Sequence, residues 1–80
     1  MRGSNLSAAD LSGTNLSYSN LTGAKLNGAN LKRANLTGVN LSNADLRNAD
    51  FTGAEMGSAV LEGANTCGAK FPVGVTVKVC

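Results

Sequence analysis

The chain has 80 residues, a length that suits one small domain. Its 7 basic and 5 acidic side chains leave a net charge of +2, without the concentrated basic surface of a nucleic-acid binder, so we expect no nucleic-acid partner. Histidine is absent, which removes the usual general base and a common metal ligand, so we expect no enzyme activity, no catalytic residue, no metal site and no cofactor.

Leucine recurs at every fifth residue from Leu6 to Leu46, and Phe51, Met56 and Leu61 continue the series in phase. A small residue stands two positions before each of them, and a residue that is usually Asn or Asp stands between. This period fits a three-residue strand followed by a two-residue turn, with the polar residue facing outward. The apolar positions are therefore predicted to form a core ladder inside a solenoid: Leu6, Leu11, Leu16, Leu21, Leu26, Leu31, Leu36, Leu41, Leu46, Phe51, Met56, Leu61 and Phe71.

The two residues after each leucine are mostly Ser, Thr, Asn and Gly, which are typical of turns. Glycine dominates the second of these positions, as at Gly13 and Gly23, where a type II turn requires a positive φ. A positive φ is unfavourable for larger side chains, so we expect a second turn geometry at the corners where they stand in this position. These residues are Ala8, Tyr18, Arg33 and Ser58.

The units ADLSG, ANLKR, ANLTG, ADLRN and ADFTG resemble the pentapeptide-repeat family, whose pattern is A(D/N)LXX. The resemblance covers residues 4–73. It implies an all-β fold, a right-handed quadrilateral parallel β-helix with four pentapeptides in each coil, and hence about 3.5 coils in this solenoid. The number of sides and the hand come from the resemblance alone, because the period by itself does not specify them.

The repeat pattern weakens after Leu61. Thr66 replaces leucine, and valine then alternates with other residues from Val73 to Val79. An alternating segment of this kind reads as an extended strand with one apolar face. We therefore expect a single pentapeptide-repeat domain over residues 1–80, with repeats at about 4–73 and a β-like cap at about 72–80 that covers the last coil.

Cys67 and Cys80 are the only cysteines, and their even number and position allow a disulfide that pins the cap. Two free thiols, as in reducing compartments, are the alternative. No apolar run approaches the roughly 20 residues of a membrane span, and the start MRGS resembles an expression leader rather than a signal peptide. We expect a soluble protein without a membrane partner, cytoplasmic or, with the disulfide, in a periplasm or thylakoid lumen.

The remaining charged and aromatic residues are interpreted as surface positions. Asp45, Asp50 and Glu55 are neighbours in the repeat series, but successive repeats face in different directions, so we expect no convergent metal ligation. Lys32 and Arg33 form the only basic pair and are expected on a solvated mixed face. The wrap places Asp10, Asp50 and Lys70 on the same side. Tyr18 is interpreted as incidentally exposed, with a contact residue as the alternative.

The resulting hypothesis is a non-enzymatic structural or protein-interaction module with an unknown protein partner. The resemblance suggests an alternative, a DNA mimic that binds DNA gyrase, but such proteins are strongly acidic and this chain is not. Ice or surface binding is a third hypothesis, because Ser17 with Thr37, and Thr22 with Ser42, form short hydroxyl rows. The unpaired edge of the first coil also allows an end-to-end homodimer.

Overall fold

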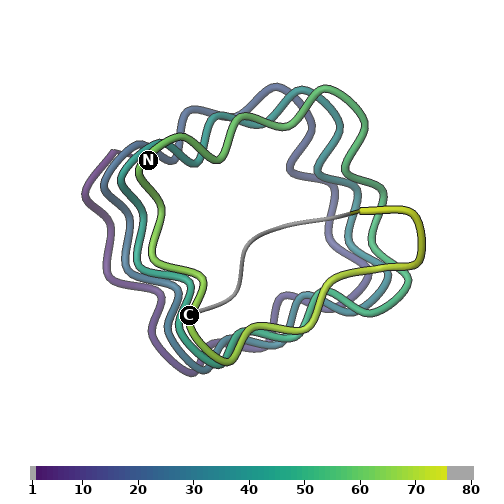
Figure 1. Cartoon of the computed structure of the whole chain (residues 1–80), viewed down its shortest axis with the longest axis horizontal. Helices are drawn as coiled ribbons and strands as arrows, with labels where there is room; N and C mark the ends of the chain where they lie inside the picture. The colour runs from purple at the N-terminus through teal and green to yellow at the C-terminus, as the bar shows by residue number, and fades with distance from the viewer. Residues whose placement is uncertain (1, 76–80) are drawn as a thin grey trace.

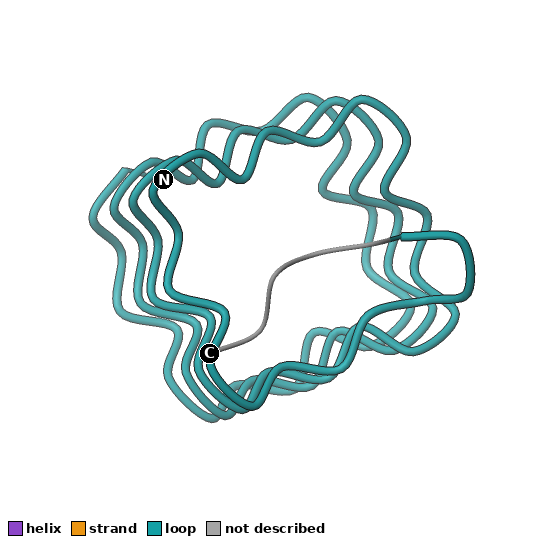
Figure 2. Ribbon diagram, viewed as in Figure 1, coloured by secondary structure: helices purple, strands orange, loops and turns teal. Residues whose placement is uncertain are grey.

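The structure is a computed structural model that describes residues 2–75. The chain winds as a stack of four-sided coils, so that each residue lies beside the residue one coil later (Figure 1). Parallel bridges join Asn5 to Lys25, and the same spacing continues to the bridge between Asp50 and Lys70. Within residues 2–75 there are no helices and no extended strands, because each bridge is a single residue long (Figure 2).

We name the four sides of the coil A to D in chain order, and each corner by the two sides that it joins. Side A holds residues 4–6, 24–26, 44–46 and 64–66; side B holds 9–11, 29–31, 49–51 and 69–71; side C holds 14–16, 34–36 and 54–56; side D holds 19–21, 39–41 and 59–61. The central residue of each triplet, polar everywhere except at Val60, is the bridging residue.

Neighbouring coils are joined by backbone hydrogen bonds on every side. At the first bridge the amide of Leu6 donates to the carbonyl of Lys25 at 2.7 Å, and the amide of Lys25 donates to the carbonyl of Ser4 at 2.8 Å. The pattern repeats up the stack, and it satisfies buried backbone groups that a three-residue strand could not satisfy alone. Bonds between coils therefore hold the solenoid together along its sides, and turn bonds such as that from the amide of Ala9 to the carbonyl of Leu6 at 3.0 Å close its corners.

The corners share one geometry, and the expectation of a second turn type is wrong. From Gly3 to Gly68, the second turn residue of every corner has a positive φ, including values of 58° at Ala8 and 60° at Tyr18. The other non-glycine residues with a positive φ are Arg33, Asn43, Asn48 and Ser58. The cause is the stacking of the coils, because the amide of Tyr18 also donates to the carbonyl of Thr37, 2.8 Å away in the next coil. This cross-coil bond supports the left-handed turn at Tyr18 against the local preference of the residue.

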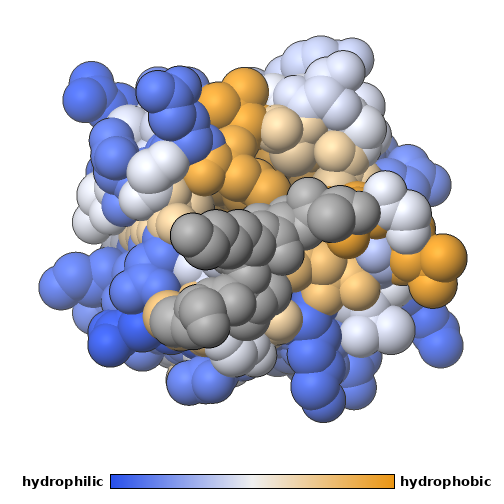
Figure 3. Space-filling view, in the orientation of Figure 1, coloured by the Kyte–Doolittle hydropathy of each residue, from blue (hydrophilic) through white to orange (hydrophobic). Residues whose placement is uncertain are grey.

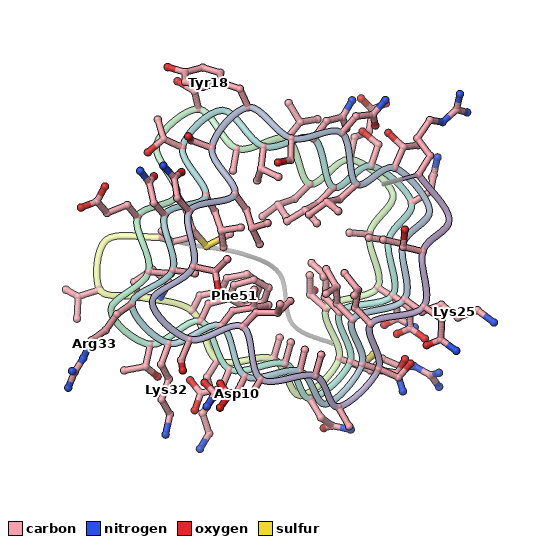
Figure 4. The ribbon with its side chains drawn as sticks, turned by 180° about the vertical axis from the view of Figure 1, so that it is seen from behind. Asp10, Tyr18, Lys25, Lys32, Arg33 and Phe51 are labelled. Atoms are coloured by element: carbon pink, nitrogen blue, oxygen red, sulfur yellow. The ribbon has the colours of Figure 1, made fainter. Side chains whose placement is uncertain are left out.

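The leucine positions point into the bore of the coil and form its core (Figure 4). The fully buried members are Leu21, Leu26, Leu31, Leu36, Leu41, Leu46 and Phe51. Those at the two ends are partly buried: Leu6, Leu11, Leu16, Met56, Leu61 and Phe71. Phe51 and Phe71 stack in successive coils with ring centroids 5.0 Å apart. Buried alanines pack beside the leucines, and Thr66 is buried where the ladder loses leucine.

The last described residues form a turn, so the expectation of an extended segment from Val73 is wrong for this stretch. The amide of Val75 donates to the carbonyl of Pro72 at 3.1 Å, and Gly74 has a φ of 92°. Val73 occupies the repeat position that elsewhere takes a positive φ, which is costly for a β-branched residue, so the turn moves forward by one residue to Gly74. The remainder of the predicted cap lies outside the described residues. Figure 3 shows apolar surface at this end of the coil, inside a mostly hydrophilic perimeter.

Candidate functional site

Two corner residues combine a large side chain with a left-handed backbone. Tyr18 and Arg33 both have a φ of 60°, in the position that glycine fills at most other corners. For a residue with a side chain, this conformation costs roughly 1–2 kcal/mol relative to the ordinary helical one. Residues held in such conformations are concentrated at functional sites. The chain thus displays a tyrosine and an arginine where a glycine would be less strained.

Tyr18 and Arg33 lie at the two corners that bound side C (Figure 4). The Tyr18 side chain is 78% exposed, yet its ring lies against the next coil. A Cβ on Gly38 would lie 2.5 Å from both Cδ1 and Cε1 of this ring. Arg33 leans the same way, with its Cγ 3.4 Å from where a Cβ on Gly53 would be. Both side chains are therefore supported from beneath while their polar ends remain accessible.

The surface of side C carries little charge. Its central column is Asn15, Asn35 and Glu55, and Asn35 Oδ1 accepts the amide of Thr37 at 3.1 Å. Within residues 2–75, the Glu55 and Arg33 side chains make no ion pair or hydrogen bond. Side C therefore presents amides along its centre, with one unpaired carboxylate among them and one unpaired guanidinium at the corner.

In the described part of the chain, two ion pairs involve charges of sides A and B. Arg47 Nη2 lies 2.7 Å from Asp45 Oδ2 on side A, and Lys32 Nζ lies 3.7 Å from Asp50 Oδ2 on side B. The mixed face expected for the basic pair is therefore present for Lys32. These exposed ion pairs contribute little to stability, and they offset only part of the charge on the two sides.

A shallow pocket of about 320 Å³ lies on the outer surface at corner BC. It is lined by Ser12, Gly13, Asn30, Lys32 and Arg33. The first coil has short side chains at this corner, whereas the second coil has the two long basic ones. The pocket is the step between them, and Arg33 belongs both to this pocket and to the boundary of side C.

The comparisons with known proteins agree with this architecture. A sequence model described as Pentapeptide repeats matches residues 1–33 and 29–65, with 8 copies of the repeat. The chain belongs to the pentapeptide-repeat family. Members of this family form right-handed quadrilateral β-helices, the architecture that the resemblance implied. No individual curated protein matches this chain.

Two solved pentapeptide-repeat proteins from cyanobacteria are similar to it. HetL from Nostoc sp. strain PCC 7120, a protein involved in heterocyst differentiation regulation, has a TM-score of 0.85 and 35% sequence identity over 95% of this chain and 35% of HetL. Rfr23 from Cyanothece 51142 has a TM-score of 0.74 and 38% identity over 86% of this chain and 54% of Rfr23. This pentapeptide-repeat chain thus spans about a third of one relative and about half of the other.

The acidic residues of this pentapeptide-repeat protein do not converge. Asp45, Asp50 and Glu55 lie on sides A, B and C respectively. Among residues 2–75, no group of three or more His, Cys, Asp or Glu side chains is arranged to hold a metal ion. The same part of the chain contains no helix of the length and hydropathy that a membrane crossing needs.

Cys67 is disulfide-bonded in the structure and lies at corner AB of the last coil. Cys80 lies outside the described residues, so its pairing with Cys67 stays a prediction.

Three aspartates support their own corners and titrate below their ordinary value. The side chain and the amide of Ser12 both donate to Asp10, and these bonds lower the pKa of this carboxyl. Bonds from Thr52 lower the pKa of Asp50 in the same way. On side A, the hydrogen-bonded guanidinium of Arg47 lowers the pKa of Asp45, and that carboxylate raises the pKa of Arg47.

Acid is expected to destabilise the fold through these carboxylates. Because their pKa values are lower in the folded than in the unfolded chain, their contribution is complete above the unfolded value and is lost as the pH falls through the folded one. Thermal melts at pH 7 and pH 3 should show a lower melting temperature at pH 3. In the double variant Asp10→Asn with Asp50→Asn the drop should be smaller, because asparagine accepts the same bonds without titrating, as Asn15 does from Ser17. An equal drop in both proteins would contradict this assignment.

The sequence placed Tyr18 and Arg33 on the surface, with a contact role only as the alternative for Tyr18 and a solvated mixed face for Arg33. The signal that could have identified them is positional. Each is a bulky residue in a slot that glycine otherwise dominates, which is an exception that needs a reason. The pocket could not have been found in this way, because it depends on which side chains of successive coils lie over one another.

Proposed function

We propose that this pentapeptide-repeat protein is a non-enzymatic interaction module that binds a protein partner through side C, with Tyr18 and Arg33 as its principal contacts. The observation that carries the proposal is that two large side chains, both in strained left-handed positions, bound the same flat side. Tyrosine and arginine are among the residues that most often dominate binding energy in protein interfaces. Between them the centre of side C carries two asparagine amides and one carboxylate, that of Glu55.

The rigidity of the scaffold supports this role. The Tyr18 ring rests on Gly38, and the amide of Arg33 donates to the carbonyl of Thr52 in the next coil at 2.9 Å. Residues that are already ordered lose less conformational entropy when a partner binds. The involvement of HetL in heterocyst differentiation regulation belongs to that protein, and for this chain it supports only the general class of a regulatory binding protein.

The other two hypotheses have less support. The hydroxyl groups of Ser17, Thr22 and Ser42 each donate to the asparagine two residues earlier, so they serve the corners rather than a regular ice-binding lattice. A DNA mimic needs rows of available carboxylates, whereas those of Asp45 and Asp50 are paired with cations. The binding of another protein through side C explains the two strained corner residues, which the other hypotheses do not.

Affinity capture from an extract of the source cells tests the proposal. The bait is the whole chain, compared with a Tyr18→Gly, Arg33→Gly double variant that restores the residue preferred at both corners. Proteins bound through side C should be recovered at least about tenfold less with the double variant, because two interface anchors are removed. Quantitative mass spectrometry measures the recovery.

Ala8→Gly is the matched control, because it makes the same backbone change at corner AB, away from side C. Partners lost with the double variant but kept with Ala8→Gly are the expected result. Circular dichroism verifies that all three proteins are folded. If the double variant and the control capture the same proteins in the same amounts as the unchanged chain, side C is not the binding surface.

A further inference from the structure

The corner BC pocket has a structural cause that keeps it open. Left-handed corner side chains lean toward the following coil, so the side-chain oxygen of Asn43 occupies the place of a Cβ on Gly63, and Tyr18 does the same at Gly38. A long side chain at position 13 would meet the Cβ of Arg33 in this way. Gly13 has nothing within 4 Å of where its Cβ would be. Arg33, which forms one wall of the pocket, thus disfavours a large side chain at position 13, which forms its floor.

The polar groups around the pocket are mostly donors. Arg33 and Lys32 line the pocket with side chains that lean toward the third coil; the Arg33 guanidinium has no carboxylate partner in residues 2–75, and Asp50 only partly offsets the Lys32 ammonium at 3.7 Å. The Asn30 side-chain oxygen accepts the amide of Lys32 at 3.1 Å, which leaves the NH2 of Asn30 to donate. Ser12 is directed away, because its hydroxyl donates to Asp10 at 2.7 Å.

The unpaired guanidinium favours a ligand that carries negative charge. Asp50 compensates Lys32 in part, and Asp10 keeps its charge but accepts hydrogen bonds from Ser12, whereas the guanidinium of Arg33 has no carboxylate partner within residues 2–75. A guanidinium matches a planar group with two oxygens, because it can donate two parallel hydrogen bonds to it. A carboxylate has this shape and this charge, and a volume of about 320 Å³ can accept one together with the carbons that carry it.

We propose that the corner BC pocket is a carboxylate-binding subsite that receives an acidic side chain or the terminal carboxylate of the protein bound on side C. That the carboxylate belongs to a protein bound on side C rests on the function proposed above. The subsite itself does not depend on that function. The pocket adjoins side C through Arg33, so one partner can cover the amide surface and place its acid in the pocket. The preferred partner surface therefore carries an acidic residue at its edge, next to the group that contacts Tyr18.

The subsite is tested on the whole chain by nuclear magnetic resonance, with sodium acetate as the probe. The protein is labelled with ¹⁵N, held at pH 7, and titrated at constant ionic strength with chloride replaced by acetate. Exposed ion pairs are weak, so we expect a dissociation constant for acetate of about 1–100 mM. The Gly13 amide and the Arg33 Nε–H should move together along one binding curve, while amides of sides A and D remain still.

Three variants make the titration specific. Arg33→Gly should abolish the saturable shifts, and Lys32→Gln should weaken binding by about threefold because it removes a neighbouring partly screened charge. Lys25→Gln on side A is the control, since it removes one positive charge outside the pocket and should leave the curve unchanged. Equal weakening by Lys25→Gln would show that acetate responds only to net charge, which would overturn the subsite.

A parallel titration with inorganic phosphate separates a carboxylate site from a general anion site. Acetate that binds at least as tightly as phosphate supports the proposal, and phosphate that saturates the same signals at much lower concentration would replace it with a phosphate site. No saturable shift with acetate would also overturn it. That result would leave the role of side C intact if Tyr18→Gly alone still reduced partner capture, so the two proposals fail separately.

Discussion

The variant Leu31→Lys is expected to lose its cooperative unfolding transition altogether. Leu31 is 0% exposed and lies in the bore, in the column that also contains Phe51. Removing a buried leucine costs about 1.5–3 kcal/mol, and burying an unpaired ammonium costs several kcal/mol more. Together these penalties reach the free energy of unfolding of a typical small domain, which is about 5–15 kcal/mol. A thermal melt followed by circular dichroism should show no sigmoidal transition.

The matched control, Asn35→Lys, places the same residue on the outside of the adjacent side. It loses the hydrogen bond that Asn35 Oδ1 accepts from the Thr37 amide, so it should cost only about 1 kcal/mol. Lys25 already occupies the equivalent position on side A and is exposed there. Similar melting curves for the two variants would refute the assignment of inside and outside positions.

Gly38→Ala is expected to cost about 2–3 kcal/mol, clearly more than the same change at Gly13. Both glycines have a φ of 68°, so both variants carry the left-handed penalty of about 1 kcal/mol. Only at Gly38 would the new methyl group collide with the Tyr18 ring, because the space at Gly13 is open. Urea unfolding should show the larger loss at Gly38, and in a Tyr18→Gly background the two losses should become equal. Equal losses in the unchanged background would show that the Tyr18 ring does not collide with the methyl group added at Gly38.

Replacing a strained corner residue with glycine should stabilise the protein. Ser58 has a φ of 60° and is preceded by Gly57, whose φ lies outside the left-handed range. The glycine of this corner therefore stands one residue before the left-handed position. Ser58→Gly should raise the free energy of unfolding by about 1 kcal/mol, because it relieves the left-handed strain. A destabilised Ser58→Gly variant in the same urea experiment would show that the corner does not carry this strain.

The ladder of the fold follows directly from the sequence, because a five-residue period with one apolar position leaves few ways to bury that position. Leu31 and Phe51 are inside as that pattern requires. The number of sides was accessible only through resemblance to a family. The uniform corners were not foreseen, because local preference at Ala8 argues against a positive φ while the hydrogen bond to the next coil supports it.

The candidate site was less accessible than the fold. The exposure of Tyr18 follows from its place in the repeat, but its support by Gly38 depends on a contact between residues one coil apart. The pocket likewise combines Gly13 with Arg33 across coils. Sequence reasoning that treats each corner separately misses both features.

The lean of corner side chains toward the following coil also limits how such a chain can change its length. Deleting residues 34–38 would leave the leucine ladder continuous, but it would place Tyr18 over Asn43 and Arg33 over Ser58 instead of over glycines. The leucine ladder tolerates the deletion or insertion of one pentapeptide. The contacts between corner residues are kept only when a whole coil is deleted or inserted. Gene duplications that extend this protein, and designs that splice its repeats, should therefore succeed in steps of twenty residues, the spacing of the bridges from Asn5 to Lys25 onward.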